Sequence, residues 1–193
     1  INRYGTLEFN EIGQLDEDSS VAKTKASIMN YDVINQSDNN FSPTTLRKQL
    51  KAVIISTTGG WENYRHQADA LAIYRLLRNN GVSDDDIILF SIDDVPWMPQ
   101  NYMQGDIRHE EGGPNLREYG VIDYSKNSVS SENIRKVLLG QHSTETPLVL
   151  ESNENSNILI YLVGHGSPKA INFMDGSQLT SKVLAQLIDE MYE

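Results

Sequence analysis

A histidine stands between two glycines at the end of an apolar run, in the segment Gly164-His165-Gly166. An imidazole can act as general base or general acid because its unperturbed pKa, about 6.5, lies close to neutral pH. Glycines beside it let another backbone approach closely. His165 is therefore the first candidate for a catalytic residue. The alternative, a loop histidine bonded to a backbone carbonyl, stays open.

A second group of polar side chains stands at the start of a predicted helix over residues 63–80. Apolar residues recur in this segment at helical spacing, and Asn79-Asn80-Gly81 is typical of a helix end. Because residues four and seven positions apart share a face of a helix, His66 and Asn63 lie on the same face as Ala70. The first turn is thus expected to point polar groups toward the sheet that this face covers.

Two apolar runs predict the strands that position these groups, at residues 52–56 and 158–163. Runs without polar alternation are typical of parallel strands that are buried on both faces. Ligands of open α/β sheets bind beyond the carboxyl ends of the strands, where the turn at residues 57–60 and the segment around His165 both fall. We therefore predict that the two strands adjoin in a parallel sheet and that both loops face one crevice.

The other predicted elements complete an α/β arrangement. They are a strand at 87–92, an irregular connection at 95–127, a helix at 131–139 capped by Ser130 or Ser131, a small hairpin at 171–174, and a last helix capped by Thr180. The acidic turn at 83–86 is interpreted as solvated rather than as a calcium site, because the EF-hand ligand spacing is absent.

Residues 1–50 are predicted to be a lead-in segment or the remnant of a preceding domain. Polar and acidic clusters separate short apolar islands there, of which Tyr4–Phe9 and Ser27–Ile34 are candidate strands. The organised domain is expected to span residues 51–193, and the candidate functional residues all lie in it.

Composition excludes several classes of function. The net charge of −11 disfavours nucleic acid as a partner, and no run approaches the roughly 18 apolar residues of a membrane span. Zero cysteines exclude disulfides, thiolate zinc sites and a cysteine nucleophile within these 193 residues. Nucleotide binding at residues 57–60 is disfavoured because neither G-x-G-x-x-G nor a P-loop lysine is present. The sequence therefore indicates no cofactor and no metal.

Two motifs resemble those of a known family of cysteine peptidases. Residues 60–70 read GWENYRHQADA and closely resemble the signature of legumain, the asparaginyl endopeptidase. The segment around His165, followed by Phe173-Met174-Asp175, is similar to the catalytic subunit of the glycosylphosphatidylinositol transamidase, a member of the same family. The similarity runs from about residue 51 to 193. It implies a caspase-like three-layer α/β sandwich with a mostly parallel central sheet.

The resemblance also implies roles for individual residues. His165 would be the general base, Asn63 would orient it, and the Gly166 N–H would donate to the oxyanion. Arg65 and His66 would belong to the pocket that holds the side chain before the cleaved bond. In such chemistry a thiolate attacks the carbonyl, and fixed donors stabilise the developing negative charge.

Each of the helix-start residues also has a structural interpretation that the sequence leaves open. Asn63 would then only cap the helix. Arg65 would form a surface ion pair with Glu62 or with Asp69, which lies four residues on, and His66 would be a satisfied histidine on the helix face.

The chain departs from the family in having no cysteine, which the family carries after the next strand. The fold is therefore expected to be incomplete at its C-terminal side, with the nucleophile on a following segment of the same precursor. The expected function is part of a secreted or otherwise extracytoplasmic cysteine endopeptidase that cleaves peptides or proteins after Asn or Asp. A transamidase of the same family and a non-catalytic caspase-like binding module remain the alternatives.

Overall fold

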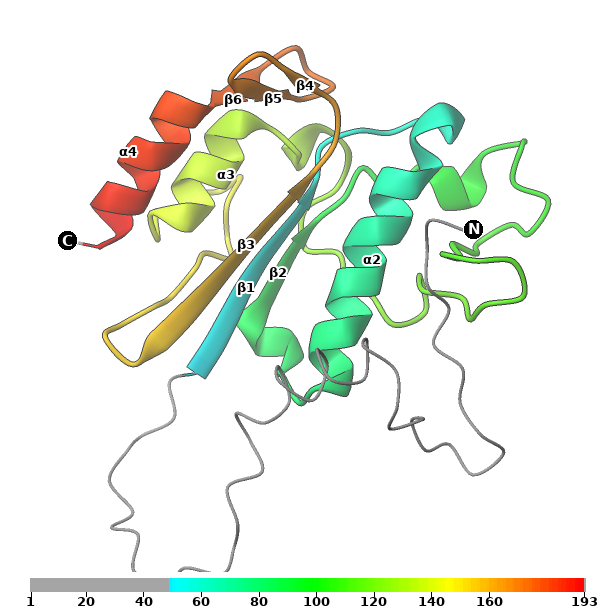
Figure 1. Cartoon of the computed structure of the whole chain (residues 1–193), viewed down its shortest axis with the longest axis horizontal. Helices are drawn as coiled ribbons and strands as arrows, with labels where there is room; N and C mark the ends of the chain where they lie inside the picture. The colour runs from blue at the N-terminus through cyan, green and yellow to red at the C-terminus, as the bar shows by residue number, and fades with distance from the viewer. Residues whose placement is uncertain (1–48, 193) are drawn as a thin grey trace, which may run out of the picture. The chain divides into compact units, whose positions relative to one another are not determined.

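A parallel three-stranded sheet forms the centre of the computed structural model, which describes residues 49–192 (Figure 1). These residues all fall within one compact unit. The strand order is β2-β1-β3, with β1 at Gln49–Ser56, β2 at Ile87–Phe90 and β3 at Ser156–Val163. The predicted adjacency of β1 and β3 is confirmed, and their register pairs Ser56 with Val163. The two candidate strands at residues 4–9 and 27–34 lie outside the described residues.

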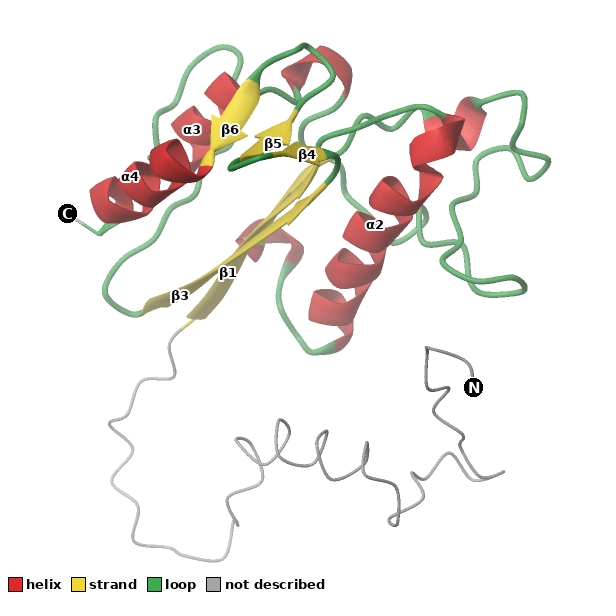
Figure 2. Cartoon of the chain, turned by 45° about the horizontal axis from the view of Figure 1, so that its top comes forward, coloured by secondary structure: helices red, strands yellow, loops and turns green. Residues whose placement is uncertain are grey.

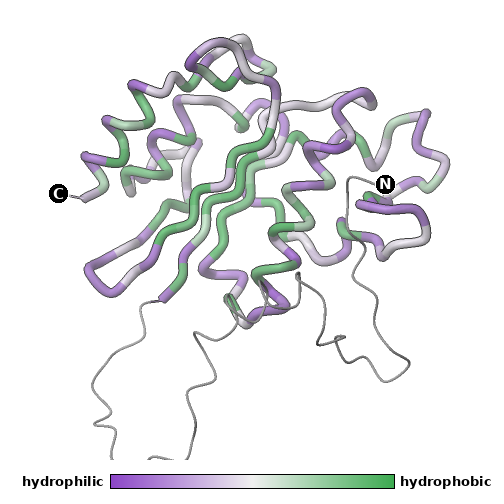
Figure 3. The backbone as a smooth tube through the Cα atoms, in the orientation of Figure 1, coloured by the Kyte–Doolittle hydropathy of each residue, from purple (hydrophilic) through white to green (hydrophobic). Residues whose placement is uncertain are grey.

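Helices cover both faces of the sheet. Helix α2 (Tyr64–Asn79) packs on one face, and α3 (Ser131–Leu138) and α4 (Ser181–Met191) pack on the other (Figure 1). Successive residues of β1 point to opposite faces, so Ile54 joins the cluster under α2 while Ile55 joins the cluster under α3 and α4. The hydrophobic stretches in Figure 3 accordingly follow the strands. The predicted three-layer α/β sandwich is confirmed.

The prediction that residues 158–163 are buried on both faces is wrong, because these residues are only partly buried. Their side chains do alternate between the two clusters, with Leu162 packing toward α3 and α4 and Tyr161 toward α2. None of the eight residues of β3 is fully buried, however, whereas five residues of β1 are. Within residues 49–192, β3 pairs with β1 alone, so it lies at the edge of the sheet and β1 takes the central position.

A small antiparallel sheet follows β3 and leads into the last helix. It consists of β4 (Gly166–Ser167), β5 (Ala170–Asn172) and β6 (Gln178–Thr180), so the predicted hairpin corresponds to β5 and β6, two of its three strands. Figure 2 shows this element beyond the ends of β1 and β3. The Thr180 hydroxyl accepts the Val183 N–H and caps α4, as predicted. Ser130 caps α3 in the same way.

Element boundaries differ modestly from the predicted ones. A 3-10 turn at Trp61–Asn63 precedes α2, so Asn63 occupies the position just before the α-helix. Strand β2 ends at Phe90, two residues earlier than expected. The following connection has short 3-10 turns at Val95–Trp97 and Lys126–Ser128 and an isolated parallel bridge between Tyr124 and Phe90. None of the described helices combines the length and apolar character needed to cross a bilayer.

Candidate active site

The two candidate loops meet in a direct hydrogen bond between His165 and Asn63. The Nε2 atom of His165 lies 2.7 Å from Oδ1 of Asn63, although the residues are 102 positions apart in the sequence. The parallel pairing brings them together because β1 and β3 end side by side, and the Thr57 N–H continues the pairing by donating to the Val163 carbonyl at 3.0 Å. The predicted meeting of the two loops at the carboxyl ends of β1 and β3 is therefore confirmed.

The amide of Asn63 is held in one orientation. Its Nδ2 donates to the Gly59 carbonyl at 2.7 Å, and a carbonyl can only accept, so Oδ1 must be the atom that faces the imidazole. In a neutral imidazole this bond requires the tautomer with the proton on Nε2, which leaves the lone pair on Nδ1. The side chain of Asn63 makes no capping bond to α2, so the interpretation of Asn63 as only a helix cap is wrong.

The two glycines beside His165, Gly164 and Gly166, differ in their structural surroundings. A Cβ on Gly164 would lie 1.9 Å from Oγ1 of Thr57, so no larger residue fits where the two loops approach. The Asn172 N–H donates to the His165 carbonyl, and Gly166 is the next residue along this antiparallel ladder. Hydrogen-bonded and non-hydrogen-bonded pairs alternate along an antiparallel ladder, and Gly166 with Ile171 forms a non-hydrogen-bonded pair. The Gly166 N–H therefore points away from β5. Gly166 is also exposed.

His66 lies buried beneath His165. Its Nδ1 is 2.6 Å from Oγ1 of Thr58, and its ring meets the His165 ring edge to face with the centroids 5.1 Å apart. Burial lowers the pKa of His66 below its usual value, and the neighbouring charges of Arg65 and His165 lower this pKa further. The residue is thus a satisfied, neutral histidine on the helix face at neutral pH, and it touches the imidazole of His165.

Arg65 lies on the surface, and its guanidinium bonds to backbone rather than to a carboxylate. The Nη1 atom donates to the Glu62 carbonyl oxygen at 2.8 Å. Asp69, the other expected partner, instead lies 2.9 Å from Nε2 of His109. Neither expected carboxylate pairs with Arg65 in the described part of the chain, so its positive charge faces solvent beside Asn63.

Three further residues that sequence reasoning missed hold the loop after β1. The carboxylate of Asp94 accepts the Gly60 N–H at 2.8 Å and Nε2 of Gln67 at 2.6 Å. The Gly59 N–H donates to the sulfur of Met174, from the β5–β6 turn. The available signal was the position of Asp94 shortly after a parallel strand, where polar residues line the ligand end of a sheet.

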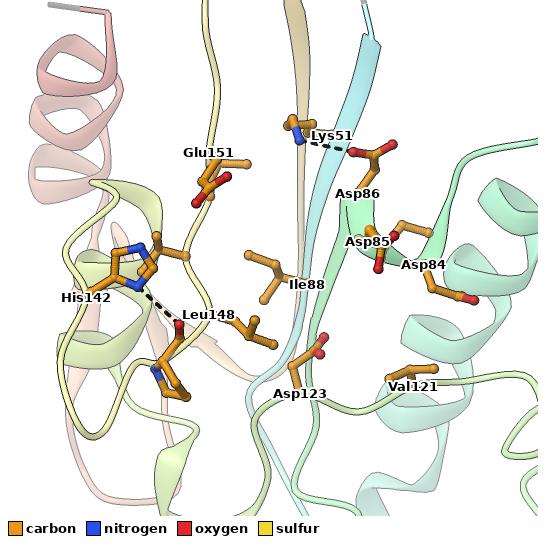
Figure 4. Close-up of a pocket in the computed structure, with 14 residues that line it drawn as sticks. Lys51, Asp84, Asp85, Asp86, Ile88, Val121, Asp123, His142, Leu148 and Glu151 are labelled. Atoms are coloured by element: carbon orange, nitrogen blue, oxygen red, sulfur yellow. Dashed lines mark hydrogen bonds and ion pairs between the residues drawn. The ribbon is translucent and has the colours of Figure 1, made fainter.

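The acidic turn at residues 83–86 lies at the opposite end of the sheet, beside a cavity of about 310 Å³ (Figure 4). The turn is only partly solvated: Asp86 pairs with Lys51 at 3.0 Å, whereas Asp85 is exposed. Asp123 also lines the cavity, and burial raises the pKa of its carboxyl. Across residues 49–192, no cluster of His, Cys, Asp or Glu is arranged to hold a metal ion.

The lowered pKa of His66 makes a testable contribution to stability. In the window below about pH 6.5 the unfolded chain binds a proton that the folded chain excludes, so stability rises with pH there. We expect the free energy of unfolding to fall as pH is lowered through about 6.5, and the variant His66→Gln to lose this component. Urea unfolding at several pH values measures it, with exposed His142→Gln as the matched control. Identical pH profiles for the parent chain and His66→Gln would contradict the assignment.

Comparison with known proteins gives one family. The sequence model of the Peptidase C13 family matches residues 50–193. The chain is 31% identical over 164 residues to the vacuolar-processing enzyme delta-isozyme of Arabidopsis thaliana, covering 83% of this chain and 35% of that protein. It is 34% identical over 147 residues to the GPI-anchor transamidase of Homo sapiens, covering 74% and 37% respectively.

The GPI-anchor transamidase of Saccharomyces cerevisiae is also 34% identical over 147 residues, covering 74% of this chain and 36% of that protein. The chain thus spans little more than a third of the length of these relatives. The family match covers well over half of the 193 residues and includes both candidate loops. By this match, the chain belongs to the Peptidase C13 family.

Proposed function

We propose that this chain supplies the histidine base and part of the substrate pocket of a cysteine endopeptidase that cleaves after Asn or Asp. The hydrogen bond between His165 and Asn63 is the observation that carries the proposal. It leaves Nδ1 of His165 as the basic nitrogen and fixes the ring, as a third polar group does in thiol peptidases.

In the proposed reaction His165 takes the proton from a cysteine thiol, and the thiolate attacks the substrate carbonyl. Asn63 holds the imidazole in the required tautomer and orientation. The backbone N–H of Gly166 donates to the oxyanion, and its outward direction supports this role. When the intermediate collapses, the imidazolium returns its proton to the leaving amine.

Arg65 and His66 are proposed to shape the pocket for the side chain before the cleaved bond. The exposed guanidinium of Arg65 offers donors to the carbonyl or carboxylate oxygen of Asn or Asp. His66 is buried, so its proposed part is to support the pocket floor and the His165 ring by contact. The structure thus favours Arg65 for the direct contact.

The nucleophile is proposed to lie on a following, cysteine-bearing segment of the same precursor. The sequence contains no cysteine, and the curated relatives are more than twice as long as the part matched here. We also propose that residues 51–193 form the N-terminal part of the peptidase domain and that residues 1–50 precede it. The start of the family match at residue 50 supports this division.

A transamidase reaction is the second candidate, because relatives named GPI-anchor transamidase match at 34% identity. The chemistry differs only in the acceptor, an amine instead of water. An extracytoplasmic location is proposed for either activity, and the relative named as a vacuolar-processing enzyme supports it. A non-catalytic binding module would keep the fold but never form an acyl-enzyme.

The need for a thiol can be tested with the 193-residue chain and with the protein that includes its cysteine-bearing segment. On an Asn-containing peptide we expect no cleavage by the first and alkylator-sensitive cleavage by the second. A positioned base contributes about 10²- to 10⁴-fold, so His165→Ala in the complete protein should lose activity by that factor. Hydroxylamine added to this assay serves as the amine acceptor, so a transamidase reaction would give a hydroxamate product. Cleavage by the 193-residue chain, or cleavage that resists alkylation, would contradict the proposal.

The proposed contact of Arg65 with substrate predicts a specific kinetic change. Removing a charge-assisted hydrogen bond that forms on binding should raise KM for Asn and Asp peptides about tenfold, with kcat little changed. Steady-state kinetics of Arg65→Ala in the complete protein measure this. Arg135→Ala is the matched control, because Arg135 is an exposed arginine on α3. Unaltered kinetics across a panel of Asn, Asp and Arg peptides would make Arg65 purely structural.

A further inference from the structure

A second cavity lies directly beside the start of α2, and Trp or Tyr supplies three of its eleven lining residues. Its volume is about 460 Å³, and Trp61, Tyr64 and Tyr102 line it together with the loop at residues 101–112. The rings of Trp61 and Tyr64 meet edge to face with centroids 5.2 Å apart. Tyr102 is 88% exposed, so its ring is accessible to a ligand that enters the pocket.

Hydrogen bonds to the loop at residues 101–112 hold the walls of this aromatic pocket. The Arg108 N–H donates to the hydroxyl of Tyr64 at 2.6 Å. The buried amide of Asn101 donates to the Asp106 carbonyl at 2.9 Å. The pocket is therefore preformed, so a ligand would not need to order it.

The charges around the aromatic pocket favour a cation. Arg108 is neutralised by Asp106 at 2.6 Å, and His109 lies 2.9 Å from Asp69. The remaining charged lining residues, Glu110 and Glu111, are exposed carboxylates. Aromatic faces attract cations, and two surplus negative charges strengthen that attraction in a chain whose net charge is −11.

We propose that the aromatic pocket is a substrate subsite that binds the cationic side chain, Lys or Arg, of a peptide lying across Asn63. This rests on the proposed peptidase function. Trp61 begins the 3-10 turn that ends at Asn63, and Tyr64 begins α2 directly after it, so two residues that line the pocket flank Asn63 in the chain. An extended peptide advances about 3.3 Å per residue, so the distance from the cleaved bond to the pocket decides which substrate position carries the cation.

Binding is measured first on the 193-residue chain, using tryptophan fluorescence. Trp97→Phe leaves Trp61 as the single tryptophan. The probes are blocked Asn hexapeptides in which one lysine is moved through the positions around Asn, each matched by a norleucine peptide. At one or more positions we expect the lysine peptide to have a Kd about fivefold lower than that of the matched norleucine peptide. Added salt should weaken this preference.

Two variants of the pocket should remove the preference without disturbing the core. Tyr102→Ala removes an exposed ring, and the double variant Glu110→Gln/Glu111→Gln removes the surplus charge. Each is expected to bring the lysine-to-norleucine ratio close to one. Tyr192→Ala and Glu118→Gln are matched controls at exposed positions outside the pocket, and they should keep the ratio.

The same peptides are then used as substrates of the complete, cysteine-bearing protein. A lysine preference in kcat/KM that Tyr102→Ala abolishes supports the subsite. Cleavage with equal kcat/KM for lysine and norleucine peptides would overturn the subsite and leave the peptidase standing. A third outcome is that the 193-residue chain binds lysine peptides selectively but the complete protein cleaves none of the peptides. This result would refute the proposed peptidase function, and the pocket could then not be a substrate subsite.

Discussion

The close parallel pairing of β1 with β3 is the constraint on which the candidate site depends. The pairing continues to the last residues of both strands, where Thr57 bonds to Val163, and Gly164 then packs so tightly on Thr57 that a Cβ would not fit. Two loops that are a hundred residues apart are thereby fixed against each other. A slip of one residue in this register would turn every side chain of β3 to the opposite face and move His165 away from Asn63.

Much of this arrangement follows from local features of the sequence. Apolar runs identify the strands, and the hydroxyls of Ser130 and Thr180 mark helix starts, because their bonding partners lie only three residues away. The placement of Asn63 and His165 at one end of the sheet follows from the general position of ligand sites in parallel sheets. Their orienting and basic roles came from the family resemblance, and they remain proposals.

Contacts between distant segments were beyond sequence reasoning. Asp94 holds the loop after β1 through Gly60 and Gln67, and nothing near Asp94 in the sequence indicates those partners. Asp69 likewise bonds to His109, forty residues away, rather than to Arg65 at helical spacing. The burial of β3 was overestimated because an apolar run indicates a strand but not its position in the sheet, and β3 lies at the edge of the described strands.

The central claim is that Asn63 fixes His165 in the tautomer protonated at Nε2, with Nδ1 as the base. Imidazole ¹⁵N chemical shifts of the 193-residue chain, recorded with the His165 ring in its neutral form, measure this most directly, because protonated and unprotonated ring nitrogens resonate far apart. The account predicts an Nε2–H tautomer for His165 that is lost in Asn63→Ala and retained in the control Asn79→Ala, at the far end of α2. An Nδ1–H tautomer, or shifts for His165 that Asn63→Ala leaves unchanged, would contradict it.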